Sequence, residues 1–487
     1  MTRGSEAGGS WWVALRAAIL SEAKDLVRQT CPRSRRPGEI PWSRCALPRD
    51  DGLPSHRLLL AGTLLLVACA APNGGTDRQT VRFWAFGREG EVVQQLMPEF
   101  ERRNPGVRVE VQQIPWTAAH EKLLTAFVGG ATPDIAQMGN TWVPELAAVN
   151  AIEPLDGYVA RSTGVKAAGF FPGIWATNVV DGQLYGLPWY VDTRVLFYRT
   201  DLLRRAGYAR PPASWAEWVE AMRKVKRLGA PTEYGALLPL DEWAMPVILG
   251  LQAGSPLLAD GGRRGAFRDP RFREALRFYV SLFREGLAPA VANTQISNVY
   301  QEFGRGRFAF YVTGPWNVGE FRNRLPADAQ DRWATAPLPG PGGAAQGVSM
   351  AGGSSVVLFR ASPNKAAAWK LAEYLTEPAV QARFYELTGD LPARTESWRA
   401  PKLADDAQLR AFATQLERTV PLPQVPEWEL IAQRVAQYTE QAARGRLTID
   451  AATAALDREV DRTLEKRRWL LDRAAARGAA PVDGAPR

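Results

Sequence analysis

Cysteine is almost missing from this chain. Its 487 residues contain three cysteines, Cys31, Cys45 and Cys69, and all of them precede residue 70. A disulfide framework, a zinc–thiolate site and a cysteine nucleophile all need cysteine side chains. The roughly 400 residues after Cys69 therefore exclude all three kinds of site.

Histidine is equally scarce. The chain has two histidines, and His120 is the one that lies beyond the first 70 residues. Hydrolases with a Ser-His-Asp triad use histidine as general base, and many transition-metal sites use it as a ligand. We therefore expect no catalytic triad, no metal site and no cofactor.

A strong charge bias is also missing. The formal net charge is +9, and removing residues 1–68, which hold 10 Lys and Arg against 6 Asp and Glu, leaves +5. So mild and evenly spread a charge offers no basic patch for a nucleic acid. The 46% apolar and 23% charged residues are typical of a globular protein, and a chain of this length exceeds one hydrophobic core. We expect two or more lobes.

A short apolar run near the N-terminus predicts export. Residues 58–68 (LLLAGTLLLVA) are too few to span a bilayer but suit the core of a signal peptide. The four residues that end at Cys69 (LVAC) resemble the bacterial lipobox, in which the cysteine is diacylated and becomes the mature N-terminus. We expect residues 1–52 to be an over-extended reading frame, residues 53–68 a lipoprotein signal peptide and residues 69–76 a tether. The mature protein would be a lipoprotein anchored through Cys69 on the periplasmic side of the cell envelope.

Beyond the tether, strand and helix patterns alternate. The predicted strands cover residues 81–86, 107–114 and 133–138, and the predicted helices residues 91–103 and 118–128. This alternation predicts an α/β sheet with crossover helices, and ligands of such sheets lie beyond the carboxyl ends of the strands. Residues 84–89 and 140–142 are therefore candidates for a ligand cleft.

The stretch from Gly186 to Leu203 (GLPWYVDTRVLFYRTDLL) predicts a loop, a buried strand and a capped helix. Trp189, Tyr190 and Asp192 directly precede the strand. Two large aromatic side chains and a carboxylate are costly at such a place unless they face something, and an aromatic-lined, wet cleft would satisfy all three. The alternative is an ordinary buried strand with no ligand nearby.

The second half of the chain carries further helix signals. Capping residues predict helices that start at Ser214, Asp269 and Ser362, and helical spacing predicts one long helix over residues 449–475, followed by a disordered tail, residues 476–487. The sequence Gly-Arg-Gly at residues 304–306 precedes a strand rather than a helix, so we exclude a phosphate-binding loop there.

Three separated stretches resemble the family-1 extracellular solute-binding proteins, the carbohydrate-binding lipoproteins of bacterial ABC importers. They are the lipobox before a cysteine-free body, residues 182–202 (GQLYGLP, then LFYRTDL) and residues 303–316 (FGRGRFAFYVTGPW). Shorter pieces with the same pattern are FERRNP at residues 100–105, ATPD at 131–134 and SPNK at 362–365. The resemblance covers roughly residues 80–465 and is similar to the maltose- and trehalose-binding members. One departure is Tyr198-Arg199, where the family often has Tyr-Asn.

The resemblance implies a periplasmic-binding-protein-like α/β fold, with two α/β lobes joined by a three-crossing hinge and a ligand cleft between them. Lobe 1 would comprise residues 77–187 and 340–388, and lobe 2 residues 192–334 and 395–475. The crossings would fall near residues 188–192, 335–339 and 388–394. The protein would be a monomer and no enzyme. It would capture a di- or oligosaccharide and deliver it to the permease subunits of an ABC importer.

The resemblance also implies a set of ligand-binding residues. They are Trp84, Glu89, Asn140, Trp142, Trp189, Asp192, Trp243, Trp316, Gly352, Gly353 and Arg394. The chemistry suits a sugar, because its apolar C–H faces stack on indole rings while carboxylate, amide and guanidinium groups bind its hydroxyls.

Three alternatives remain open at this stage. An exported glycan-active enzyme could use paired carboxylates such as Asp192 and Glu242. A binding protein for another polar solute, such as a glycerophosphodiester, would need arginines at the cleft, for which Arg88 and Arg394 are candidates. A sensor lipoprotein would pass no ligand to a permease. The resemblance leaves the sugar, its linkage and its length open.

Overall fold

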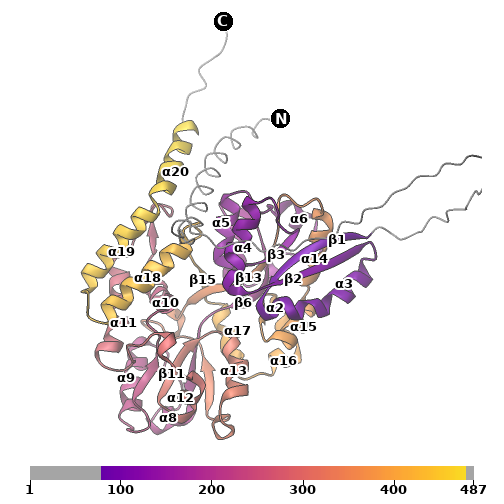
Figure 1. Cartoon of the computed structure of the whole chain (residues 1–487). Coiled ribbons are helices and arrows are strands. Elements are labelled where there is room, and N and C mark those ends of the chain that lie inside the picture. Colours follow the sequence, from indigo (N-terminus) through magenta and orange to yellow (C-terminus); the bar gives the residue numbers. More distant parts are fainter. Residues whose placement is uncertain (1–77, 479–487) are drawn as a thin grey trace, which may run out of the picture.

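The computed structural model describes residues 78–478, whose strands form two main sheets with separate sets of helices (Figure 1). The predicted signal peptide and Cys69 lie outside the described residues, as do residues 479–487 of the tail. Among residues 78–478, no helix is long and apolar enough to cross a membrane.

The first sheet is mixed. In spatial order its strands are β14 (Leu391–Pro392), β6 (Leu187–Asp192), β13 (Ser349–Leu358), β3 (Ile135–Gly139), β1 (Gln79–Phe86) and β2 (Val107–Ile114), and β15 (Thr419–Pro421) pairs with the start of β13. Strands β1, β2 and β3 are parallel, whereas β13 runs antiparallel to both β3 and β6. Successive side chains of β1 enter two different apolar clusters, Phe83 one and Phe86 the other, so both faces of this sheet are buried.

Helices pack on both sides of the first sheet. They are α2 (Gly87–Val92), α3 (Met97–Arg103), α4 (Trp116–Val128), α5 (Val143–Ala148), α6 (Asp156–Arg161), α7 (Pro172–Ala176), α14 (Lys365–Leu375) and α15 (Pro378–Thr388). The prediction of one helix over residues 91–103 is wrong. That stretch is split by a 3₁₀ turn, η1 (Val93–Leu96), and Pro98 lies in the first turn of α3, where its missing N–H costs nothing.

The second sheet has the order β12 (Trp333–Ala336), β7 (Val195–Arg199), β11 (Phe308–Thr313) and β8 (Tyr234–Leu237). Its helices are α8 (Thr200–Arg205), α9 (Trp215–Lys226), α10 (Ala244–Gln252), α11 (Pro270–Arg284), α12 (Val299–Arg305) and α13 (Trp316–Arg324), and a hairpin joins β9 (Leu258–Ala259) to β10 (Arg264–Gly265). Two predicted caps are confirmed: the side chains of Ser214 and Asp269 accept hydrogen bonds from the first backbone N–H groups of α9 and α11.

The C-terminal part is mostly helical. It contains α16 (Pro401–Ala404), α17 (Arg410–Leu416), α18 (Trp428–Ala443), α19 (Ile449–Thr463) and α20 (Glu465–Gly478). The predicted single helix over residues 449–475 is wrong, because α19 ends at Thr463 and Leu464, whose side chain is fully buried, separates it from α20. Helix α20 lies beside the β9–β10 hairpin, where the Arg468 guanidinium donates to the carbonyl oxygen of Arg263.

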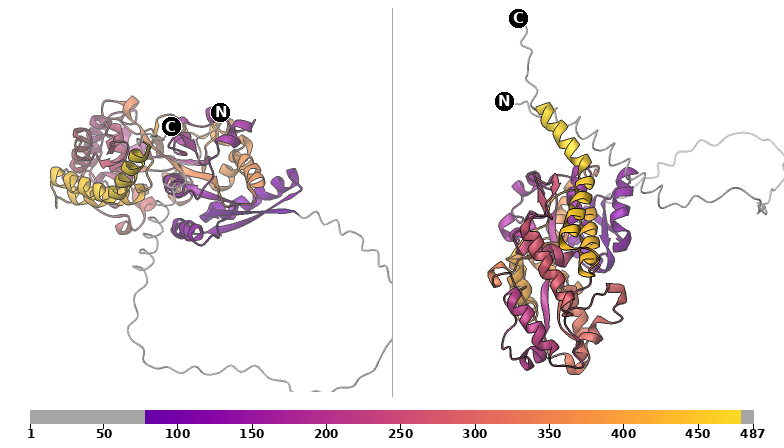
Figure 2. Two further views of the ribbon diagram at one scale, coloured as in Figure 1. Left: turned by 90° about the horizontal axis from the view of Figure 1, so that it is seen from above. Right: turned by 90° about the vertical axis from the view of Figure 1, so that its left-hand side faces the viewer.

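The chain passes repeatedly between the two lobes, which lie side by side when viewed from above (Figure 2). Strand β6 of the first sheet leads directly into β7 of the second, and β12 of the second sheet is followed by β13 of the first. After β14 the chain continues to α18 and α19, which pack on α11. The two-lobed α/β fold expected from the sequence is confirmed.

The stretch that begins at Gly186 was predicted to be a loop before the buried strand, and this prediction is wrong, because residues 187–192 form strand β6. Strand β6 lies between β13 and β14, so its backbone groups are paired on both sides. Residues 187–191 are all buried. The Gly-Leu-Pro signal therefore marks the entry to a central strand rather than a loop.

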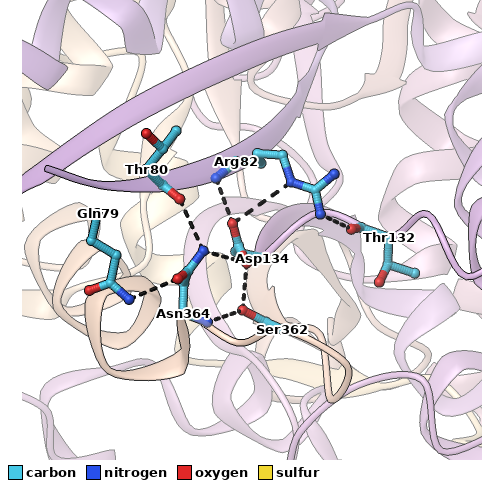
Figure 3. Close-up of polar contacts among 7 residues, drawn as sticks. All are labelled: Gln79, Thr80, Arg82, Thr132, Asp134, Ser362 and Asn364. Carbon is cyan, nitrogen blue, oxygen red and sulfur yellow. Dashed lines mark hydrogen bonds and ion pairs between the residues drawn. The ribbon is translucent and has the colours of Figure 1, made fainter. Parts of the chain in front are cut away.

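A buried carboxylate joins two of the short motifs noted in the sequence (Figure 3). Asp134, from ATPD, is 1% exposed and accepts hydrogen bonds from the backbone N–H of Arg82 at 2.8 Å and the Ser362 hydroxyl at 2.6 Å. The amide nitrogen of Asn364, from SPNK, lies 3.3 Å from the same carboxylate. Ser362 is not the residue that caps α14 as predicted, because Asn364 directly precedes that helix. The Ser362 hydroxyl instead accepts from the backbone N–H of Asn364 at 3.0 Å while it donates to Asp134.

Candidate functional site

A cavity of about 960 Å³ lies between the two lobes. One wall belongs to the first lobe and comes from the start of α2, the start of α4 and the end of α15. The opposite wall is formed by α12 and α13 of the second lobe, and α16 contributes to the rim. Loops and helix ends from far apart in the sequence thus enclose a space large enough for a small solute.

Two tryptophans from opposite lobes line this cavity. Trp116, the first residue of α4, is 37% exposed, and Trp316, the first residue of α13, is 46% exposed. Tryptophan side chains are mostly buried in folded proteins. An indole that is exposed in a cavity can stack on a ligand. The arrangement provides an apolar surface on each side of the space.

Glu89 lies on the first-lobe wall, held by a chain of hydrogen bonds that starts in the core. Its carboxylate accepts from the Tyr190 hydroxyl at 2.9 Å and from Trp116 Nε1 at 3.2 Å. Tyr190 in turn accepts from Gln137 Nε2 at 2.9 Å, and Gln137 accepts from the backbone N–H of Phe86 at 2.7 Å. Gln137 is fully buried, so this chain fixes the orientation of Glu89 at the cavity.

Two further carboxylates stand beside Glu89. Strand pairing sets Leu391 opposite Val191, which puts Asp390 next to Asp192 at the end of the sheet, and Asp390 lines the cavity. Burial raises the pKa of Asp390 to about 7, and the negative charges of Glu89 and Asp192 add to the shift. Asp192 has a cationic partner, because its Oδ1 lies 2.6 Å from Nη1 of Arg194.

The pKa of Asp390 makes a prediction for stability. Between about pH 4 and about pH 7 the folded protein keeps the proton of the Asp390 carboxyl, whereas the unfolded chain has lost it. The stability that the protonated carboxyl contributes is therefore fully present below about pH 4 and is lost as pH rises through about 7. In urea unfolding, we expect the stability of Asp390→Asn relative to that of the unsubstituted protein to be higher at pH 8 than at pH 5. The exposed Asp328 provides the control substitution, Asp328→Asn, and an equal gain for Asp390→Asn at both pH values would contradict the prediction.

Two of the predicted ligand residues, Trp84 and Asn140, are held inside the first lobe. Trp84 is 8% exposed within β1, and the ammonium group of Lys122 lies 4.9 Å from its ring. Strand β1 continues two residues beyond Trp84, so this side chain lies within the sheet and not at its end. Asn140 is 4% exposed and donates to the Thr177 hydroxyl at 2.7 Å.

Trp189 and Arg394 are also buried. The Trp189 ring is fully buried and stacks on Phe384 with centroids 4.5 Å apart. The Arg394 guanidinium donates to the carbonyl oxygen of Gly164 at 2.9 Å and lies 4.9 Å from the ring of Phe170. Neither side chain lines the cavity in this conformation.

Neither Trp142 nor Trp243 lines the cavity. Trp142 follows β3 and meets Trp116 edge to face, with centroids 5.8 Å apart, so it supports one of the exposed indoles. Trp243 directly precedes α10 and contacts Trp428 edge to face at 6.1 Å. Of the predicted residues, Glu89 and Trp316 are the two that line the cavity.

Gly352 and Gly353 allow close contact between β13 and β6. Gly353 has φ +124°, and a Cβ there would lie 2.3 Å from the carbonyl oxygen of Tyr190, whereas a Cβ on Gly352 would meet nothing nearer than 3.2 Å. We expect Gly353→Ala to lower the free energy of unfolding by about 2 to 3 kcal/mol through strain and overlap. Gly352→Ala is the matched control, and equal losses in chemical denaturation would contradict this account.

The sequence analysis missed Trp116, Gln137 and Asp390. Trp116 stands two residues after β2, as Glu89 stands three residues after β1, so the rule about carboxyl ends of strands could have found it. Gln137 was hidden within a predicted strand, where polar residues carry no signal of their own. Asp390 became visible through the pairing of β14 with β6, which the sequence does not reveal.

A cavity between two α/β lobes, with an exposed indole on either side and fixed carboxylates on one wall, defines a two-lobed solute-binding protein. Comparison with known proteins agrees. A family model for the bacterial extracellular solute-binding proteins matches residues 86–382. The chain belongs to this family.

Similar proteins span nearly the whole folded region. The structure of the sugar-binding protein MalE from Xanthomonas citri is 52% identical, with a TM-score of 0.79, covering 81% of this chain and 99% of that one. A binding protein of Brucella abortus (strain 2308) is 28% identical over 415 residues, which are 84% of this chain and 98% of the relative. The galactooligosaccharide-binding protein of Bacillus subtilis (strain 168) is 25% identical over 389 residues, covering 76% and 87%.

Proposed function

We propose that this protein captures a di- or oligosaccharide in the cavity between its lobes and delivers it to the permease of an ABC importer. The observation that carries the proposal is the pair of exposed indoles, Trp116 and Trp316, that line one cavity from opposite lobes. A sugar ring has two C–H faces, so a ligand between the lobes could stack on one indole from each. The relatives named for sugar and galactooligosaccharide binding support the same ligand class.

In this proposal the polar groups on the first-lobe wall bind the sugar hydroxyls. Glu89 is oriented by Tyr190 and Trp116 and retains acceptor capacity for a hydroxyl donor. Asp390 and Asp192 lie beside it, and Trp142 supports Trp116. For Trp84, Asn140, Trp142, Trp189, Trp243, Gly352, Gly353 and Arg394, contact with the ligand remains a prediction from the resemblance.

The charges at the cavity favour a neutral ligand over a phosphodiester. Basic residues do line it, but carboxylates of the same cavity compensate several of them: Arg322 bonds Asp406 at 2.6 Å, Lys402 lies 3.3 Å from Glu386, and Arg324 pairs with Glu320. A phosphate would have to compete with these partners for the guanidinium groups. A polyol needs no net positive charge.

The proposal includes the wider organisation predicted from the sequence. Lobe 1 would comprise residues 77–187 and 340–388, and lobe 2 residues 192–334 and 395–475, so that closure traps the sugar. The protein would act as a monomer, exported and anchored by a diacylated Cys69. Membership of a family of extracellular binding proteins supports export.

A thermal-shift screen of the purified protein against mono-, di- and trisaccharides tests the ligand class. A ligand at about 100 times its Kd adds roughly 2.7 kcal/mol to the stability of the folded state, which gives a clear shift. We expect at least one di- or trisaccharide to raise the melting temperature. A shift with glycerophosphodiesters and with no sugar would refute the carbohydrate assignment.

A further inference from the structure

The ring of Trp316 rests against the edge of the second sheet. A Cβ on Gly314 would lie 2.0 Å from this ring, so the indole packs directly on the glycine backbone. The guanidinium carbon of Arg194 lies 4.5 Å from the ring centroid. Strand pairing sets Thr313 opposite Val195, which makes Gly314, just after β11, and Arg194, just before β7, neighbours. These two residues together form the support on which the exposed indole lies.

Arg194 is itself fixed from several directions. Its Nη1 lies 2.6 Å from Oδ1 of Asp192, and its backbone N–H donates to the Ser349 hydroxyl at 3.1 Å. The neighbouring Thr193 hydroxyl donates to the carbonyl oxygen of Met350 at 2.9 Å. The backbone around Arg194, which links β6 of the first sheet to β7 of the second, is therefore tied to the start of β13. The position of the guanidinium follows from these contacts.

We infer that Arg194 is a positioning residue for ligand binding: its guanidinium holds the Trp316 ring in the orientation that stacks on the sugar, and Asp192 holds the guanidinium. The inference rests on the proposed function. A half-exposed indole without such support would sample several rotamers, and the entropy cost of fixing one of them would lower the affinity for the ligand. Attraction between the guanidinium and the ring face reduces that cost before the ligand arrives.

The test is a double-mutant cycle on sugar affinity, measured by isothermal titration with the sugar that gives the largest thermal shift. We expect Arg194→Met to weaken binding about tenfold in the otherwise unsubstituted protein. With Trp316→Ala already present, we expect the same substitution to change the affinity less than about twofold, because no ring remains to be held. Arg161→Met is the matched control, since Arg161 lies 5.4 Å from the ring of Tyr158. It should bind normally.

A second variant keeps the test valid if Arg194→Met does not fold. Arg194→Lys keeps a cation for Asp192 but lacks the planar guanidinium, and we expect a loss between that of methionine and none. An unchanged affinity in either folded variant would overturn the inference, as would an equal loss with and without Trp316. Absence of sugar binding by the unsubstituted protein would instead refute the proposed function, so the two failures are distinguishable.

Discussion

Replacing Trp316 by alanine is expected to weaken sugar binding about 30-fold, equivalent to about 2 kcal/mol, with little change in the stability of the free protein. The ring is 46% exposed and lines the cavity, so its truncation removes ligand contact while it opens no void in the core. We expect Trp116→Ala to show an effect of the same kind, because Trp116 lies on the opposite wall. Isothermal titration measures both affinities.

Trp469→Ala is the control for this prediction. Trp469 is 51% exposed on α20, away from the cavity lining, so it offers an indole of similar exposure without a role in the cleft. Its replacement should leave the affinity unchanged. If Trp316→Ala and Trp469→Ala bound the sugar equally well, stacking in the cavity would not be the source of affinity.

The largest expected effect on stability belongs to Asp134. Its buried carboxylate joins β1 through Arg82 to the loop before α14 through Ser362 and Asn364 (Figure 3). Asp134→Ala would remove the acceptor of the Arg82 backbone N–H and of the Ser362 hydroxyl, whereas Nδ2 of Asn364 would keep the carbonyl oxygen of Thr80 at 3.0 Å. We expect a cost of about 3 to 5 kcal/mol. Chemical denaturation of the free protein measures this loss.

Asp156 provides the matched control for Asp134. It is exposed, and its carboxylate accepts one backbone hydrogen bond, from Leu184 at 3.1 Å. We expect Asp156→Ala to cost about 1 kcal/mol or less, because water can replace the lost acceptor. Similar losses for the two substitutions would show that the buried network around Asp134 contributes little.

Local chemistry explains why parts of the fold were predictable. The caps at Ser214 and Asp269 depend on side chains that act on their own helix, so their signal lies within a few residues. The break between α19 and α20 has no such signal: Leu464, which stands at it, belongs to the buried apolar cluster of the second lobe. Strand β6 was taken for a loop since its pairing with β13 and β14 involves residues some 160 and 200 positions away.

The site was less predictable for the same reason. Glu89 was a candidate because it stands shortly after the first predicted strand, at the edge where ligands bind, whereas Trp316 was named from the family resemblance. Trp84 was counted among the cleft candidates, residues 84–89, although it lies inside the strand predicted over residues 81–86. The structure places it within β1, two residues before the strand ends. The SPNK and ATPD motifs carried a family resemblance without a visible reason, and the reason is the contact between Ser362 and Asp134. The residues of the site come from strands and loops far apart in the sequence, and the pairing of those strands determines which side chains lie together.

A crystal structure with the sugar from the thermal-shift screen tests the central claim most directly. The account predicts a sugar between the lobes, with C–H faces against Trp116 and Trp316 and a hydroxyl within hydrogen-bond distance of the Glu89 carboxylate. A sugar bound elsewhere, or one that contacts neither indole, would contradict it.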